Sequence, residues 1–241
     1  MAFFRVIIKL LIRMFRYKNI CEIGASFGGN TDKLLSIKSV ILTIIDPCID
    51  TDLINKYKNT KRVRIYKGLS LQILPTIVGQ FDCILIDGDH NWFTVFNELK
   101  VIEERKLLKD GGTIFLHDVG WPYGRRDMYY LPETIPDKYR HPYAKKGIVQ
   151  GQTKLAEAAG INSHINNVEY EGGPKNGVLT AVEDYLKIYG KSYYFIYSKR
   201  QQGLGVLVYK KNISYFNKLV LKIWRFLEDS IPMIEKAPIR N

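Results

Sequence analysis

The chain has 241 residues, a length that suits one large domain or a domain with an elaborate insertion. Its 46% hydrophobic and 25% charged residues exclude a wholly disordered chain. It carries 36 Lys and Arg against 24 Asp and Glu, a formal net charge of +12. This excess predicts attraction to an anionic partner, which could be nucleic acid, an acidic membrane surface or a charged small molecule.

Three cysteines, Cys21, Cys48 and Cys83, lie in apolar runs. Their odd number and their setting indicate core thiols of a reducing compartment, and exclude a disulfide framework or a zinc cluster. We therefore expect a cytoplasmic protein.

The opening segment is apolar but is interrupted by a basic residue every fourth position, at Arg5, Lys9 and Arg13. It therefore lacks the long uncharged span of a membrane helix or signal peptide, and predicts a basic amphipathic helix. The range 211–241 repeats this pattern as an amphipathic C-terminal helix and tail. Such helices pack on the body of the fold or in a homodimer, or they contact an anionic membrane surface.

Between the two ends, short apolar runs of strand length alternate with helical segments. This order predicts a parallel sheet with helices on both faces. The connector between the last two strands is too short for a parallel crossover, so that pair must be antiparallel. The expected strands are Asn19–Ile23, Val40–Ile45, Val63–Tyr66, Cys83–Ile86, Thr113–Leu116, Tyr193–Tyr197 and Gly205–Tyr209, and the expected helices are Asn30–Ser36, Asp50–Asn59, Leu71–Val78 and Trp92–Leu108.

A long segment, Val119–Gly190, separates the fifth strand from the final hairpin and is rich in Gly, Pro, Tyr and basic residues. In a doubly wound sheet, an insertion at the carboxyl end of a strand lies over the ligand crevice. We therefore expect a substrate-covering segment, in which Arg125 and Arg126 could pair with a phosphate or carboxylate of the ligand. The alternative is a solvated basic loop.

A glycine-containing turn, Glu22-Ile-Gly24-Ala-Ser26-Phe-Gly28-Gly29, follows the first strand directly. Small residues let a backbone turn tightly and approach a ligand. Asp46 ends the second strand, 22 residues after Gly24, where an acidic residue accepts ribose hydroxyls in doubly wound folds. The glycine spacing is not the G-x-G-x-x-G of a dinucleotide site, which disfavours a nicotinamide oxidoreductase.

Further motifs follow in order: Lys67-Gly68-Leu-Ser70, then Ile86-Asp87-Gly88-Asp89-His90, then His117-Asp118 after the fifth strand. Over about residues 17–118, with the hairpin at 193–210, this ordered set resembles the class I S-adenosylmethionine-dependent methyltransferases. Within that class it is most similar to the branch of catechol O-methyltransferases and metal-dependent sugar O-methyltransferases. The resemblance implies a Rossmann-like, doubly wound, seven-stranded α/β sheet, mostly parallel with a terminal antiparallel hairpin. It also implies a single methyltransferase domain over 1–241, with 119–190 as the covering insertion.

The resemblance also implies a role for each motif. The turn from Glu22 to Gly28 would approach the methionine part of the cofactor, and Asp46 would hold the ribose. The adenine would lie beside the turn after the third strand, and the methyl sulfonium would face the end of the fourth strand. The implied cofactor-binding residues are Glu22, Gly24, Ser26, Gly28, Asp46, Gly68, Ser70 and Asp87.

Methyl transfer to a hydroxyl is helped by a hard divalent cation, which lowers the hydroxyl pKa and orients its oxygen. Asp87 and Asp118 end neighbouring strands and could supply two carboxylate ligands, as Mg²⁺ prefers. His117 stands beside Asp118 where the resembling families carry an acidic residue, and histidine better suits manganese, iron or zinc. We expect a site of Asp87, His117 and Asp118 for Mg²⁺ or another divalent metal.

Either Asp89 or His90 could take the hydroxyl proton as a general base. In a purely structural role, Asp89 would cap the helix that begins near Trp92.

These inferences favour an enzyme that methylates a hydroxyl of a small molecule or sugar. An anionic acceptor would account for the basic covering segment. The rivals are an RNA or protein methyltransferase, and a non-catalytic, membrane-associated protein that kept the nucleotide fold. The chain carries no nucleic-acid recognition motif, and no amine-binding Asn-Pro-Pro-Tyr motif follows its fourth strand.

Overall fold

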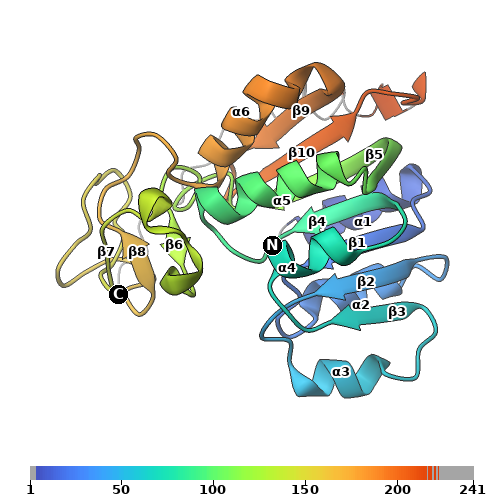
Figure 1. The fold of residues 1–241 in the computed structure, drawn as a ribbon, viewed down its shortest axis with the longest axis horizontal. Coiled ribbons are helices and arrows are strands. Elements are labelled where there is room, and N and C mark those ends of the chain that lie inside the picture. The colour runs from blue at the N-terminus through green and yellow to red at the C-terminus, as the bar shows by residue number, and fades with distance from the viewer. Residues whose placement is uncertain (1–3, 216, 219, 221, 223–241) are drawn as a thin grey trace.

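A computed structural model describes residues 4–215 together with 217, 218, 220 and 222. Its centre is a seven-stranded sheet in the order β3-β2-β1-β4-β5-β10-β9 (Figure 1). The first five strands are parallel, and β10 runs antiparallel between β5 and β9. The predicted fold class is confirmed. The strands are β1 Asn19–Ile23, β2 Ile41–Ile45, β3 Val63–Tyr66, β4 Phe81–Ile86, β5 Leu108–His117, β9 Tyr193–Ser198 and β10 Leu204–Tyr209.

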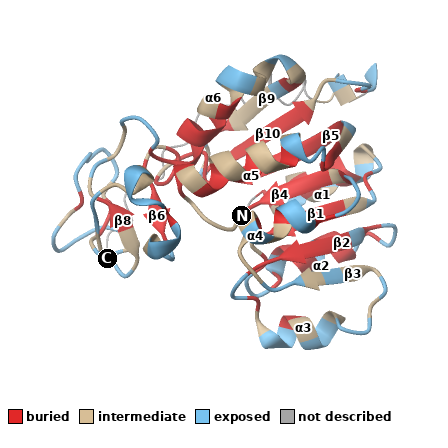
Figure 2. Ribbon diagram, in the orientation of Figure 1, coloured by how far each residue is buried: buried red, intermediate tan, exposed pale blue. Residues whose placement is uncertain are grey.

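Helices cover both faces of the sheet, so its central strands are buried on both sides (Figure 2). Side chains alternate along a strand. Ile20 of β1 therefore packs in one apolar cluster, while Cys21 and Ile23 pack in the other. This two-sided burial explains why the central parallel strands are mostly apolar runs. One face carries α1 Arg5–Met14, α2 Gly29–Leu35 and α3 Thr51–Tyr57, and the other carries α4 Ser70–Ile73, α5 Trp92–Glu104 and α6 Val178–Tyr189.

The N-terminal helix α1 forms as expected and buries Ile8, Leu11 and Ile12 against the sheet. Val6 and Leu10 remain 65% and 55% exposed on its outer side. Within the described residues, no helix is long and apolar enough to cross a membrane. The expected C-terminal helix in 211–241 lies mostly outside the described residues.

Three of the expected helices are shorter in the structure. The helix expected at 50–59 spans only Thr51–Tyr57, and Asp50 caps its first turn. The helix expected at 71–78 ends at Ile73 and continues as the 3-10 turn η1 Leu74–Thr76, because Pro75 cannot donate a helical hydrogen bond. The helix expected at 92–108 ends at Glu104, and Leu108 already belongs to β5.

Helix α6 was not among the expected helices. Val178, Ala181, Val182 and Tyr185 are buried at helical spacing, and they join the same apolar cluster as α5. The 3-10 turn η4 Gly190–Ser192 leads from α6 into β9. The range 119–190 therefore contains a helix of the main core, and the part that is separate from the sheet ends at Gly177.

The segment 119–177, which we call the covering segment, lies beyond the carboxyl ends of β4 and β5 (Figure 1). It has a small antiparallel sheet of its own in the order β6-β8-β7. Its elements are β6 Met128–Tyr129, the 3-10 turns η2 Pro132–Thr134 and η3 Asp137–Tyr139, β7 Tyr143–Ala144 and β8 Asn166–Val168.

A buried carboxylate ties the covering segment to the core. Asp127 Oδ1 accepts the backbone N–H of Trp92 at 2.7 Å and that of Gly177 at 2.6 Å. These two donors stand at the starts of α5 and α6, where backbone N–H groups lack helical partners. The carboxylate therefore fixes the segment against both helices.

The prediction that all three cysteines are core thiols is wrong for one of them. Cys21 and Cys83 are buried in adjacent strands, but Cys48 is exposed. It follows Pro47 in the loop after β2, beyond the point at which the strand enters the core.

Candidate active site

The sheet changes its direction of winding at β1, which pairs with β2 on one side and with β4 on the other. In open α/β sheets, ligands bind at this switch point, outside the carboxyl ends of the strands. A cavity of about 710 Å³ lies there. Of the predicted site residues, it is lined by Gly24, Ser26, Asp46, Ser70, Asp87 and Asp89.

The turn after β1 depends on Gly24. Its φ is +85°, and a Cβ at this position would lie 2.3 Å from the carbonyl oxygen of Asp87. Only glycine tolerates both the left-handed backbone and this close approach. Gly24 thus lets the turn after β1 and the end of β4 share one wall of the cavity.

Asp46 holds the same turn in place. Its Oδ2 accepts the backbone N–H groups of Ala25 and Ser26, each at 2.8 Å, and its Oδ1 accepts that of Cys48 at 2.7 Å. The carboxylate also lines the cavity, as predicted. Each carboxylate oxygen can accept two hydrogen bonds, so Oδ1 has capacity for one more donor.

Three residues expected at the cofactor do not line the cavity. Glu22 faces the opposite side of the sheet, where Thr31 Oγ1 donates to its Oε2 at 2.6 Å. Complete burial raises the pKa of Glu22 to about 8. Gly28 packs against Leu53, and Gly68 lies against Ile73.

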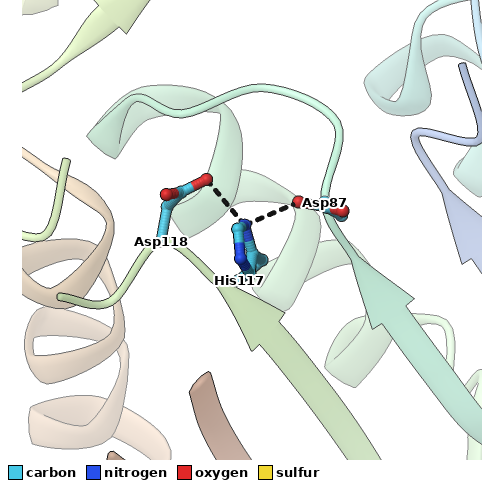
Figure 3. Close-up of side chains that lie close together, drawn as sticks. All are labelled: Asp87, His117 and Asp118. Atoms are coloured by element: carbon cyan, nitrogen blue, oxygen red, sulfur yellow. Dashed lines mark hydrogen bonds and ion pairs between the residues drawn. The ribbon is translucent and has the colours of Figure 1, made fainter. Parts of the chain in front are cut away.

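The predicted metal ligands do come together (Figure 3). His117 Nδ1 lies 3.0 Å from Asp87 Oδ1 and 2.8 Å from Asp118 Oδ2. One ligand atom from each residue can be chosen so that all three lie within 4.8 Å of one another. Asp118 has a φ of +59°, a left-handed conformation that directs the chain sharply away from β5.

The two carboxylates make this cluster attract a cation. Burial opposes protonation of His117, but its hydrogen bonds with Asp118 and Asp87 raise its pKa to about 9. Burial likewise opposes ionisation of Asp118, but the neighbouring His90 and His117 lower its pKa. Without a metal, the imidazolium occupies the position between the carboxylates.

The two candidate bases have different surroundings. Asp89 Oδ2 accepts from Asn91 Nδ2 at 2.5 Å and from Thr94 Oγ1 at 2.8 Å, so Asp89 supports the start of α5. Burial raises the pKa of Asp89, although these hydrogen bonds favour its ionised form. His90 lies beside the cluster, with its Nδ1 3.3 Å from Asp118 Oδ2, and its ring stacks on Tyr123.

Sequence reasoning missed several residues of the cavity wall. The covering segment contributes Tyr130, Leu131 and Thr134 to the cavity wall. The sequence predicted that this segment lies over the crevice, but not which of its residues border the cavity. Glu98 reaches it from α5 and is 0% exposed. Its signal was present in the sequence, because Glu98 interrupts the apolar face that Val95 and Ile102 form along the helix.

Neither arginine expected to bind an acceptor is free to do so in the structure. Arg125 forms a two-pronged ion pair with Glu183 of α6, with both N–O distances at 2.6 Å. Arg126 is 0% exposed and donates to the carbonyl oxygens of Val168 and Thr153. Both guanidinium groups therefore brace the covering segment.

Residues 22–119 match a family model described as a methyltransferase domain. This range runs from the acidic residue of β1 through the His-Asp pair at the end of β5, and so contains every residue predicted for the cofactor, the metal and the general base. No curated protein sequence matches the chain significantly.

Solved structures share the fold over most of the chain. A methyltransferase from Podospora anserina, bound to S-adenosylhomocysteine, is 15% identical with a TM-score of 0.53, over 84% of this chain and 76% of that one. An O-methyltransferase from Bacillus cereus, also in complex with S-adenosylhomocysteine, is 15% identical with a TM-score of 0.50, over 86% and 80%. A candidate caffeoyl-CoA O-methyltransferase from Staphylococcus aureus is 20% identical with a TM-score of 0.50, over 85% and 82%.

Proposed function

We propose that this chain is a class I methyltransferase that transfers a methyl group from S-adenosylmethionine to a hydroxyl of a small molecule or sugar, a proposal supported by its fold and by the methyltransferase match over residues 22–119. One observation carries the proposal. A cavity of about 710 Å³ at the switch point of the sheet is bordered by Asp87, which also belongs to a cluster of potential metal ligands. Small-molecule sites have volumes of about 300–1,000 Å³, so the cavity suits a nucleoside cofactor.

In this proposal, the cofactor lies across the carboxyl ends of β1, β2 and β4. Asp46 accepts a ribose hydroxyl through the remaining capacity of Oδ1, while it keeps the turn after β1 in place. The adenine lies beside Ser70 at the start of α4. The sulfonium methyl faces Asp87, next to the metal ligands.

The donor set fits a divalent cation. Asp87, His117 and Asp118 offer two carboxylates and one imidazole from adjacent strand ends, close enough to bind one ion. When bound, the ion would lower the pKa of an acceptor hydroxyl and hold its oxygen near the sulfonium methyl. A histidine among the ligands suits Mn²⁺, Fe²⁺ or Zn²⁺ better than Mg²⁺.

His90 is the better candidate for the general base. The two hydrogen bonds that Asp89 Oδ2 accepts hold that carboxylate to α5, whereas His90 lies between Asp118 and the aromatic side chains of the covering segment. The hydroxyl proton passes to the imidazole as the oxygen attacks the methyl carbon. The carbon–sulfur bond breaks as the new carbon–oxygen bond forms, and the sulfonium becomes the neutral thioether of S-adenosylhomocysteine. Correct placement of oxygen and methyl supplies most of the acceleration.

The first experiment is calorimetric titration with S-adenosylhomocysteine. We expect binding by the wild type and clear weakening by Asp46→Ala, because the substitution removes both the ribose acceptor and the anchor of the turn. Asp137→Asn, a change at an almost fully exposed carboxylate, is the matched control and should bind normally. If the wild type does not bind at millimolar ligand, the cofactor assignment fails.

The second experiment tests the metal and the acceptor. We expect methyl transfer to a panel of catechols and sugars to require Mn²⁺ or Mg²⁺, and to be lost in Asp118→Asn while cofactor binding is retained. Activity that persists in chelator would refute the metal-assisted mechanism. Transfer only to RNA or to protein would refute the small-molecule acceptor.

A further inference from the structure

Glu98 is a buried acid in the wall of the cavity. It lies on the face of α5 that packs on the sheet, with Val95 and Leu99 as buried neighbours on the same helix. The residue lines the cavity, yet it is 0% exposed. Among the described residues, neither of its carboxyl oxygens has a hydrogen-bond partner of normal geometry, although the Ser70 hydroxyl lies near enough to favour the ionised form.

Such a group is costly in a folded protein. A buried polar atom without a partner loses its hydration and gains nothing in return, which is why nearly all buried polar groups are hydrogen-bonded. Here both oxygens of one side chain are left without partners beside a cavity. A ligand that fills the cavity beside Glu98 would supply the missing partners.

The surroundings of Glu98 decide which ligand group would suit it. Burial raises the pKa of Glu98 to about 8. The Ser70 hydroxyl acts to lower this pKa, and the negative charge of Asp89 acts to raise it. At neutral pH the side chain is therefore a carboxylic acid with one O–H donor and one carbonyl acceptor. Its best partner carries an acceptor and a donor side by side.

The amino edge of adenine has this pattern, with an exocyclic amine next to a ring nitrogen. Ser70, Leu71 and Thr94 line the cavity together with Glu98, at the end where the proposed function places the base. We propose that Glu98 recognises the adenine of the cofactor, accepting a hydrogen bond from the amine and donating one to the adjacent ring nitrogen. This assignment rests on the proposed function and adds to it a residue that selects adenine.

The test measures binding, so it needs neither the acceptor nor the metal. Two ligands are compared by calorimetry: S-adenosylhomocysteine and its analogue in which hydrogen replaces the 6-amino group. We expect the wild type to bind the analogue about tenfold more weakly, the effect of losing one buried hydrogen bond and leaving its partner unsatisfied. Glu98→Gln should keep this preference, because the amide also presents a donor and an acceptor.

Glu98→Leu should bind S-adenosylhomocysteine more weakly and lose the preference, so that the two ligands bind equally. Glu104→Leu, at an exposed position on the same helix, is the matched control and should behave like the wild type. If Glu98→Leu weakens both ligands but retains the wild-type ratio, Glu98 has only a structural role and the proposal fails.

Comparing the two ligands on the wild type tests the proposal even if the variants do not fold. Equal wild-type affinity for the two ligands overturns the recognition of the amine without any substitution. Absence of wild-type binding to either ligand overturns the proposed function as well, so the two failures can be distinguished.

Discussion

Glu22→Gln should stabilise the protein at neutral pH. The Glu22 carboxyl is completely buried, and burial raises its pKa from the usual 4.5 to about 8. The folded state therefore keeps a proton that the unfolded state loses between these two values. Folding stability falls as the pH rises through this window, because the unfolded state binds fewer protons there. Glutamine does not titrate and removes this dependence.

The size of the effect follows from the width of the window. Between the two pKa values, the free energy of unfolding of the wild type falls by about 1.4 kcal/mol for each pH unit. It is therefore about 3 kcal/mol lower at pH 7 than at pH 4.5. The glutamine carbonyl can still accept the hydrogen bond from Thr31. Oε1 of Glu22 has no hydrogen-bond partner, and the corresponding amide group of glutamine would have none either. The cost of burying this unpartnered group therefore changes little with the substitution.

Urea denaturation of both proteins at pH 5 and pH 7.5 measures the difference. We expect the free energy of unfolding of Glu22→Gln, relative to that of the wild type, to increase by about 3 kcal/mol from pH 5 to pH 7.5. Comparing the two proteins cancels the titration of all other groups. Glu104→Gln, at an exposed position of α5, should follow the wild type at both pH values. Parallel pH profiles for wild type and Glu22→Gln would refute the reasoning.

Three further substitutions test the packing. Asp127→Ala should cost about 2–5 kcal/mol in urea denaturation, because it leaves the buried N–H groups of Trp92 and Gly177 without an acceptor; a loss below 1 kcal/mol would contradict the bracing role. Leu99→Ala removes a fully buried side chain of α5 and should cost about 2–5 kcal/mol, whereas an unchanged midpoint would mean that the helix packs differently. Arg125→Ala breaks a half-exposed ion pair with α6 and should cost less than about 1 kcal/mol, and a larger loss would show that the pair is not screened by solvent.

The strands were predictable because each has a local cause. A central strand such as β1 is buried on both faces and is therefore a mostly apolar run. The edge strand β3 instead alternates half-buried and exposed residues, and both strands begin and end where the sequence placed them. Helix ends were less predictable, because they depend on single residues such as Pro75. Helix α6 was not predicted, because its apolar pattern lies at the end of a segment dominated by turn residues.

The site was predictable where topology alone brings residues together. Asp87 and His117 end adjacent parallel strands, so their proximity follows from the strand order. Glu98 was not predictable in the same way. A local pattern shows that Glu98 interrupts the apolar face of α5, but only the packing of α5 beside α4 decides that this residue borders the cavity.

By itself, the sequence determined the class of fold, the cluster of Asp87, His117 and Asp118, and the place of Asp46 after β2. These features depend on residues at the ends of strands, which are local signals, and on the strand order, which follows from the alternation of strands and helices along the chain. Only the tertiary structure decided that Arg125 and Arg126 brace the covering segment, that Glu22 faces away from the cavity, and that Glu98 faces it. A side chain's partners are set by which elements pack together, so its role depends on contacts between distant parts of the chain.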